Sequence, residues 1–313
     1  MKTSIWALTL VTLAATPALA DYPEKPIEII VGYAAGGGTD VMARTVGKFL
    51  EEELGGGSVV IKNEPGAGGQ IGFTHVATAK PDGYTLGTFN LPAALALTVD
   101  RKADYDAQSF TYLANFVEDP NTIVVPKSSE YNTLADLLEN SRTNPGAVTM
   151  GLSSLGGNDH FAALMMGKSA EVEFTMVPFK GAALARTAMI GGHVAAGTMA
   201  LSQTVGFEDQ LKVLAVLSDE RSPFAPEVPT AKELGYDVEM KSLRGIVAPA
   251  GLEPAVSEKL LSALAAVNAN PEFQKMMAEQ GNPVNYIEGA EFANVAEVQS
   301  EVVQSIWETT PWK

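Results

Sequence analysis

Apolar and polar positions along this chain form two recurring patterns, a short apolar run and a longer stretch with helical spacing. Residues 27–31 are mostly β-branched and predict a buried strand. Residues 41–54 carry apolar side chains at helical spacing and are followed by Gly55, so they predict an amphipathic helix. The stretch between them, residues 32–40, is rich in glycine. A strand, a glycine loop and a helix start leave backbone N–H groups unpaired at one point, where the helix dipole favours a carboxylate or phosphate.

The same pattern occurs a second time. Residues 151–159 repeat the G-x4-G-G-x-D skeleton of residues 32–40, follow an apolar run at 147–150 and precede an amphipathic segment at 161–167. Two copies predict two similar lobes, each of which presents a helix N-terminus to a cleft between them. The alternative is a chance recurrence, since many α/β proteins turn from strand to helix in this way without a ligand.

The remaining apolar runs alternate between strand and helix spacing. Strands are predicted at residues 59–61, 85–89, 121–126, 174–177, 213–217 and 245–249, and helices at residues 70–79, 182–190 and, with a break near 281–283, 255–307; residues 133–136 resemble a capping box. This alternation predicts an α/β fold with a mainly parallel sheet flanked by helices. Ligands of such sheets bind beyond the carboxyl ends of the strands, where the loops at 32–40, 63–69 and 89–92 lie.

Residues 1–20 have the composition of a secretory signal peptide. Lys2 is followed by an apolar segment at residues 5–15 and by the small-x-small cleavage site Ala18-Leu19-Ala20. The segment is too short to span a membrane. We therefore expect cleavage before Asp21 and a mature chain in the periplasm or outside of a bacterium. The sequence contains no cysteine, which excludes disulfides and thiol chemistry.

The chain is strongly acidic, with 21 basic and 37 acidic residues and a formal net charge of −16. Such a charge argues against nucleic acid and against an anionic membrane as partners. It also repels an anionic ligand, which therefore needs local hydrogen-bond donors.

Several short motifs resemble catalytic or nucleotide-binding signatures but are incomplete. Gly167-Lys168-Ser169 resembles the end of a P-loop, but Ala162 stands where that motif needs glycine and the triplet ends a predicted helix. The glycines at residues 66–72 resemble a dinucleotide fingerprint without the acidic residue that would hold a ribose. Residues 151–155 lack the second glycine of a nucleophile elbow. No set of His, Asp and Glu has metal-ligand spacing, so we expect neither a cofactor nor a metal.

Segments along nearly the whole mature chain match one family in the expected order. They are residues 22–27, 36–40 with 43–44, 63–69, 80–86, 179–181, 214–216, 221, 228–230 and 248–251. On these residues the chain resembles the extracytoplasmic receptors of tripartite tricarboxylate transporters, the Bug family. The resemblance implies a two-lobed periplasmic-binding-protein (Venus flytrap) fold that binds a small carboxylic acid in its cleft, largely through backbone N–H groups of the two glycine loops and through water.

The resemblance also implies an organisation and partners. The chain crosses between lobes near Val125 and near Gly245, so lobe 1 comprises residues 21–125 plus 245–313 and lobe 2 comprises residues 126–244. The implied partners are membrane permease subunits, and we expect the receptor to be a monomer. This chain departs from the family pattern at Gly32-Tyr33, where relatives usually have Pro-Phe, and at Arg244, where many have an aromatic residue. Both positions are expected near the pocket, so the ligand stays open between a di- or tricarboxylate, an acidic amino acid and an aromatic acid.

The candidate ligand-binding residues come from both glycine loops and from the neighbouring strand ends. They are Tyr33, Gly37, Gly38, Thr39, Asp40, Gly68, Asn90, Ser153, Ser154, Gly156, Gly157, Asn158, His160, Lys180 and Arg244. An alternative role is open for Asp40, His160, Lys180 and Arg244, and also for the neighbouring Asp159. Asp40 and Asp159 either stabilise their helix dipoles or accept an ammonium group of the ligand. His160 either contacts the ligand or covers the helix start. Lys180 and Arg244 either bind the ligand or are solvated or interlobe partners. For Arg244 the alternative partner is an acidic neighbour such as Asp237 or Glu239.

Together these observations predict a periplasmic solute receptor and not an enzyme. Two other functions remain open. An enzyme acting on a carboxylic acid would need an acid/base pair in the cleft. A ligand-sensing subunit of a membrane kinase would have the same cleft as a transport receptor.

Overall fold

The computed structural model describes residues 22–101, 103–309 and 311–312. The predicted signal peptide, residues 1–20, lies outside the described residues. Among the described residues, no helix is long and apolar enough to cross a membrane.

The described strands form one mixed sheet in the order β2-β1-β3-β9-β4-β7-β5-β6, and β8 and β10 also pair with β4. Their bounds are β1 (Ile27–Val31), β2 (Val59–Asn63), β3 (Thr85–Leu91), β4 (Phe110–Pro126), β5 (Thr149–Leu152), β6 (Thr175–Pro178), β7 (Ala196–Ala200), β8 (Leu211–Val216), β9 (Lys241–Pro249) and β10 (Val284–Glu288). At one end β1 pairs in parallel with β2 and β3, and at the other end β5 pairs in parallel with β6 and β7.

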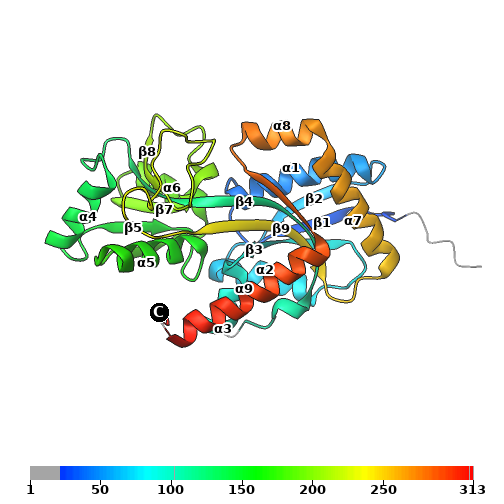
Figure 1. The fold of residues 1–313 in the computed structure, drawn as a ribbon. Coiled ribbons are helices and arrows are strands. Elements are labelled where there is room, and N and C mark those ends of the chain that lie inside the picture. The colour runs from blue at the N-terminus through cyan, green and yellow to red at the C-terminus, as the bar shows by residue number, and fades with distance from the viewer. Residues whose placement is uncertain (1–21, 102, 310, 313) are drawn as a thin grey trace, which may run out of the picture.

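The centre of the sheet is antiparallel. β4 spans 17 residues and pairs with β9 from Phe110 opposite Pro249 to Pro120 opposite Lys241. Farther along, the same strand pairs with β7 and β8. Figure 1 shows β4 and β9 running side by side through the middle of the molecule. The α/β class is therefore confirmed, while the sheet as a whole is mixed because these two long strands cross its centre in opposite directions.

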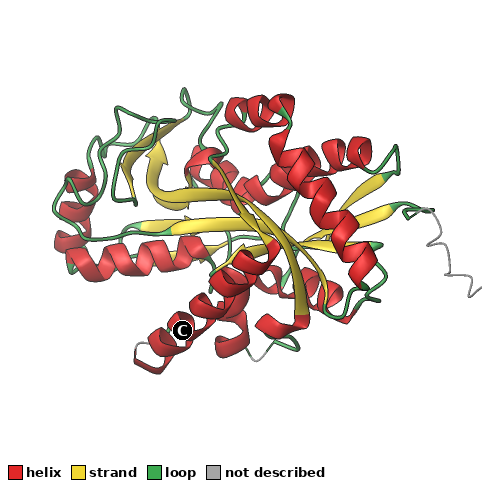
Figure 2. Cartoon of the chain, turned by 45° about the vertical axis from the view of Figure 1, so that its right-hand side comes forward, coloured by secondary structure: helices red, strands yellow, loops and turns green. Residues whose placement is uncertain are grey.

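The helices lie on both faces of the sheet (Figures 1 and 2). Their bounds are α1 (Gly38–Glu53), α2 (Gln70–Thr78), α3 (Ala93–Asp100), α4 (Leu134–Thr143), α5 (Asn158–Ala170), α6 (Ala182–Ile190), α7 (Pro254–Ala269), α8 (Pro271–Glu279) and α9 (Gly289–Thr309). α1 packs with α7 and α8, and α3 packs with α2 and α9. The predicted helix at 182–190 is confirmed, and Thr133 and Asp136 form the predicted capping box of α4.

The buried apolar side chains separate into two main groups. The first core takes residues up to Val117 and from Leu243 onward, including Phe49, Phe89 and Phe292. The second core takes residues from Ile123 to Val238. The chain passes between them along β4 and at the start of β9.

A small cluster joins the two cores near the end of the described chain. Trp312 packs edge-on against Phe161 of α5, with ring centroids 4.7 Å apart, and the cluster also takes Ala96 of α3 and Val303 of α9.

The C-terminal part differs from the prediction. Residues 255–307 contain the three helices α7, α8 and α9 and, between the last two, the strand β10. β10 pairs antiparallel with β4. The sequence predicts a break there but not a strand, because a five-residue edge strand with half-buried side chains has no strong apolar pattern.

Candidate ligand-binding cleft

A cavity of about 50 Å³, the inner compartment, lies between the two cores. From one side it is lined by Tyr33, Gly37, Gly38, Thr39, Asn90, Ser242 and Arg244, and from the other by Ser153, Gly157, Asn158, Asp159, Ala182, Ala200 and Gln203. Both repeated glycine loops reach it. The repeat in the sequence is therefore a repeat in space, with the starts of α1 and α5 at one compartment.

Three helix N-termini border this compartment. The N-cap residues of α1, α5 and α6 are Gly37, Gly157 and Gly181, and no described side chain caps any of these three helices at this end. Helix N-termini leave N–H groups without intrahelical partners and carry partial positive charge. The compartment is therefore suited to a carboxylate. The sequence predicts the starts of α1 and α5 here but not that of α6, whose preceding Phe179-Lys180-Gly181 segment is the signal that could have indicated it.

Gly38 allows a close approach between the two sides of the cleft. A Cβ atom at this position would lie 2.5 Å from Nε2 of Gln203 and 2.6 Å from Nη1 of Arg244. Gln203 belongs to the short 3-10 helix η3 (Leu201–Gln203), which follows β7. Any side chain at Gly38 would therefore displace both polar groups.

Asp40 stabilises the first loop and does not line the inner compartment. Its Oδ2 accepts hydrogen bonds from the Gly36 N–H at 2.9 Å and from Arg44 Nε at 3.0 Å, and its Oδ1 accepts one from Asn63 Nδ2 at 2.9 Å. Burial alone would raise the pKa of this carboxyl. The hydrogen bonds from Arg44, Gly36 and Asn63 outweigh burial and hold the pKa below its ordinary value. The arrangement matches the helix-capping role among the two predicted for Asp40.

Asp159 occupies the equivalent position in the second loop but lines the inner compartment. Its Oδ1 accepts from Asn121 Nδ2 at 2.8 Å and its Oδ2 from the Ser153 N–H at 3.1 Å. No ion pair neutralises it among the described residues. Burial raises its pKa despite these hydrogen bonds. The compartment thus contains one carboxyl group without a cationic partner.

His160 covers the second loop and does not line the inner compartment. It is buried, and its Nδ1 accepts the N–H of Gly156 at 3.1 Å. Burial, with a smaller contribution from Arg101, lowers its pKa to about 4. The ring is therefore neutral at pH 7 and already bonded, as in the helix-covering role among the two predicted.

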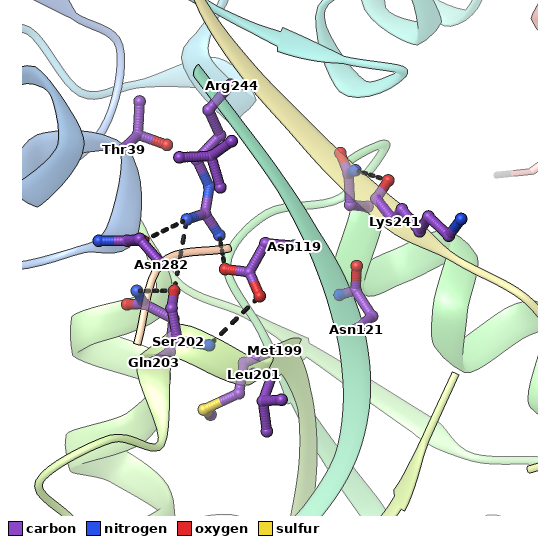
Figure 3. Close-up of polar contacts among 12 residues, drawn as sticks. Thr39, Asp119, Asn121, Met199, Leu201, Ser202, Gln203, Lys241, Arg244 and Asn282 are labelled. Atoms are coloured by element: carbon purple, nitrogen blue, oxygen red, sulfur yellow. Dashed lines mark hydrogen bonds and ion pairs between the residues drawn. The ribbon is translucent and has the colours of Figure 1, made fainter. Parts of the chain in front are cut away.

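Arg244 lines the compartment, but its charge is already paired. Nη2 donates to Oδ2 of Asp119 at 2.7 Å, and Nη1 donates to Ser202 Oγ and to Asn282 Oδ1, each at 3.3 Å (Figure 3). Arg244 and Asp119 are both buried. The partner is thus Asp119 on β4 and not Asp237 or Glu239, because β4 and β9 pair with Val117 opposite Arg244.

Amide side chains complete the inner compartment. Asn90 Nδ2 donates to Thr39 Oγ1 at 2.8 Å, and the Asn90 Oδ1 and Gln203 Oε1 atoms are buried without a hydrogen-bond partner. Asn158 Nδ2 donates to the carbonyl oxygens of Leu91 at 3.0 Å and Lys241 at 2.9 Å. Asn158 thereby ties the start of α5 to strands of the first core. Within the described structure the Asn90 and Gln203 oxygens stay unpartnered, and as acceptors they suit a water molecule or a donor group of a ligand.

A second cavity, the outer compartment, has a volume of about 230 Å³ and shares Tyr33 and Ser153 with the inner one. Its other lining residues are Gly32, Gly66, Ala67, Gly68, Gly69, Arg101, Ser154, Leu155, Pro178, Phe179 and Lys180.

The structure brings most candidate residues to one of the two compartments. Tyr33, Gly37, Gly38, Thr39, Asn90, Ser153, Gly157, Asn158 and Arg244 line the inner one; Gly68, Ser154 and Lys180 line the outer one; Asp40, Gly156 and His160 line neither. Sequence reasoning missed Gln203 and Arg101, which stand in segments without a recognisable motif, and Ala182, which directly follows the 179–181 segment. No group of three His, Cys, Asp or Glu side chains suited to a metal ion is present in the described part of the chain.

Solved structures with the same architecture are known. The periplasmic binding protein BugD superposes with a TM-score of 0.87 at 29% identity, covering 93% of this chain and 99% of BugD. The R. palustris protein Rpa4515, solved with adipate, gives a TM-score of 0.86 at 27% identity, covering 92% and 98%. The fold and the cleft between two cores define a solute-binding protein of the periplasmic-binding-protein class.

Sequence comparison gives the family. BugT of Bordetella pertussis is 32% identical over 277 residues, 82% of this chain and 85% of BugT. The family model for the tripartite tricarboxylate transporter family receptor, TctC, matches residues 42–310. The chain belongs to this receptor family, and the resemblance found in the sequence is confirmed.

Proposed function

We propose that this chain is a periplasmic receptor that binds a small organic di- or tricarboxylate in the cleft and delivers it to the permease subunits of a tripartite transporter. One observation carries the proposal: three helix N-termini without side-chain caps, from α1, α5 and α6, border one buried compartment. The similarity to a protein solved with adipate supports a carboxylate as ligand. Export by the leader at residues 1–20 accounts for the location.

Backbone N–H groups, and not a free cation, would hold the carboxylate in the inner compartment. Arg244 is the one Arg or Lys that lines it among the described residues, and Asp119 pairs with Arg244 at 2.7 Å. Hydrogen bonds to a charged group stabilise binding by about 1.5–3 kcal/mol each. Several such bonds from Gly38, Thr39, Asn158 and Asp159 N–H groups would offset the repulsion from an acidic protein.

The two lobes, residues 21–125 plus 245–313 and residues 126–244, would close on the ligand. The two separate apolar cores support this division. Contacts also join the two sides of the cleft: Ala34 N–H donates to the carbonyl oxygen of Lys180 at 3.3 Å, and Arg101 Nη2 donates to that of Leu155 at 2.9 Å. A ligand that touches both lobes favours the closed state, because its full set of contacts exists only there. The permease would recognise that closed state, with the receptor acting as a monomer.

Binding without chemical conversion fits the side chains available. The titratable groups that line the inner compartment are Tyr33, Asp159 and Arg244. Burial raises the pKa of the Tyr33 hydroxyl above its ordinary value, so it is protonated at pH 7. His160 faces Gly156 instead. Among the described residues that line the inner compartment, these groups form no acid/base pair aimed at the ligand.

An acidic amino acid is a second candidate ligand, favoured by Asp159. This buried carboxyl has no cationic partner among the described residues, and it could accept an ammonium group at the inner compartment. Its hydrogen bonds to Asn121 and Ser153 leave acceptor capacity on its oxygens.

Calorimetric titration of the purified mature chain tests the proposal. The panel would contain acetate, succinate, adipate, citrate, L-aspartate and L-glutamate. We expect saturable binding of at least one di- or tricarboxylate, with the ligand recovered unchanged. Absence of binding across the panel, or enzymatic turnover of a bound acid, would refute the receptor assignment, and stronger binding of the amino acids would favour the second candidate.

A further inference from the structure

The outer compartment is more than four times as large as the inner one, at about 230 Å³ against about 50 Å³. A cavity of roughly 10–15 Å³ holds one water-sized group, so the inner compartment has room for one carboxylate and little more. Tyr33 and Ser153 line both compartments. A ligand anchored at the three helix starts and longer than the inner compartment would therefore extend past these two residues.

Arg101 supplies a cation to the outer compartment. It follows α3, and its Nη2 donates to the Leu155 carbonyl oxygen at 2.9 Å while its Nε forms an ion pair with Oδ2 of Asp100 at 3.5 Å. Its Nη1 makes no hydrogen bond to the residues that the structure describes, and it lies 3.6 Å from the position that a Cβ on Gly68 would occupy. The guanidinium is thus fixed by two contacts and keeps one N–H edge available.

Lys180 supplies a second cation from the opposite side of the cleft. Its side chain is exposed and has no ion-pair partner in the described part of the chain. The backbone at this position is fixed, because its carbonyl oxygen accepts the Ala34 N–H at 3.3 Å. Arg101 comes from the first core and Lys180 from the second, so an anion between them would contact both sides of the cleft.

A buried hydroxyl adds a polar group without a partner. Ser154 is 4% exposed, its Oγ makes no hydrogen bond in the described structure, and the residue lines the outer compartment. A buried hydroxyl without a partner costs stability. A ligand oxygen or a water molecule in the compartment would satisfy it.

Apart from Ser153 and the Tyr33 hydroxyl, the rest of the wall is apolar or glycine. Leu155, Pro178 and Phe179 line it together with the ring of Tyr33 and the glycines of the 66–69 segment. Gly68 has φ +74°, and a Cβ there would lie 3.3 Å from the Leu155 carbonyl oxygen, so glycine keeps this wall open. The combination of apolar walls and two cations suits an apolar spacer that ends in an anionic group.

Resting on the proposed function, we propose that the outer compartment binds the second carboxylate of an elongated α,ω-dicarboxylate, which Arg101 and Lys180 select. The first carboxylate lies at the starts of α1, α5 and α6, and the methylene chain passes Tyr33. A short dicarboxylate whose second carboxylate does not reach Arg101 and Lys180 would need neither cation. The loss of affinity on replacing either cation should therefore depend on the length of the ligand, and this dependence can be measured.

The experiment is a calorimetric titration of the mature chain with α,ω-dicarboxylates from succinate to suberate and with hexanoate, the monocarboxylate of the same length as adipate. We expect affinity to rise with length to an optimum beyond succinate and the dicarboxylate of six carbons to bind about tenfold or more tightly than hexanoate. Lys180→Gln and Arg101→Gln should each weaken the preferred dicarboxylate about five- to tenfold and change hexanoate binding less than about twofold. Lys168→Gln, an exposed lysine on α5 that lines neither compartment, is the matched control.

The possible results test the second-carboxylate site separately from the receptor assignment. Because Lys180 is exposed, its variant should fold even if Arg101→Gln does not. Equal losses for dicarboxylate and hexanoate, or tightest binding of succinate with no effect of Lys180→Gln, would overturn the second-carboxylate site and leave the receptor assignment intact. Failure of all carboxylates to bind the wild-type chain would overturn both.

Discussion

Arg244 and Asp119, 125 positions apart in sequence, form a buried ion pair with 2.7 Å between Nη2 and Oδ2 at the point where β4 and β9 cross between the two cores (Figure 3). Removing one partner of a buried pair leaves an uncompensated charge and typically costs about 3–5 kcal/mol. We expect Arg244→Met to lower the melting temperature of the ligand-free protein strongly in a thermal denaturation experiment. The double variant Arg244→Met, Asp119→Leu should recover much of the loss. An unchanged melting temperature in the single variant, with lost affinity, would instead make Arg244 a ligand contact.

Gly38 and Gly37 offer a matched pair for testing the close approach at α1. A methyl group at Gly38 would lie 2.5 Å from Gln203 Nε2, whereas at Gly37 its nearest neighbour would be the Ala34 carbonyl oxygen at 3.6 Å. We expect Gly38→Ala to weaken ligand binding at least tenfold, about 1.4 kcal/mol, because it displaces Gln203 and Arg244. Gly37→Ala should bind nearly as well as wild type. Similar affinities for the two variants, measured by calorimetry, would contradict this account.

The buried imidazole of His160 predicts a loss of stability in acid. Its pKa is lowered to about 4 in the folded protein, below the ordinary value of 6.5. Its contribution to stability is therefore complete above pH 6.5 and is lost as the pH falls toward 4, by up to about 3 kcal/mol. The melting temperature of wild type should drop more steeply over this interval than that of His160→Gln, which keeps an acceptor for the Gly156 N–H. Parallel pH profiles would exclude this role.

Asp159 predicts that ligand affinity decreases with rising pH, whereas His160 predicts that stability increases with rising pH. An anionic ligand binds best when this carboxyl is protonated, and burial raises its pKa. Affinity for a dicarboxylate should therefore fall as the pH rises through that pKa. Asp159→Asn should keep or increase the affinity and flatten its pH dependence, as measured by titrations at several pH values. A large loss of affinity in this variant would indicate that Asp159 accepts an ammonium group.

The sequence predicts those parts of the site whose structure is set by residues adjacent in the chain. The glycine loops before residues 38 and 158 set helix starts through neighbouring residues alone, and both helices are found there. The pairing of Arg244 with Asp119 depends on the register of two strands far apart in the chain. No local pattern contains that register, which explains why nearer acidic residues were the expected partners.

The same distinction applies to the fold. Residues 182–190 form a helix as predicted, whereas only the last six residues of β4, 121–126, are recognisable as a strand. The earlier half of β4 is buried through pairing with β9 and β10, so its strand character comes from tertiary contacts. Arg101 lies in a segment whose apolar pattern stops at the end of α3, and only the folded chain brings it to the same compartment as Lys180.

The antiparallel pairing of β4 with β9 also bears on how closure can occur. The two crossings are neighbours in one hydrogen-bonded ladder that continues to Pro120 opposite Lys241, with two register shifts between Tyr112 and Val117. Bending such a ribbon needs no broken ladder, since irregular pairing already increases local twist. Amide hydrogens there would exchange slowly with solvent both with and without ligand, while those of the glycine loops would slow only on binding. The receptor would then keep its most persistent structure at the place where it bends.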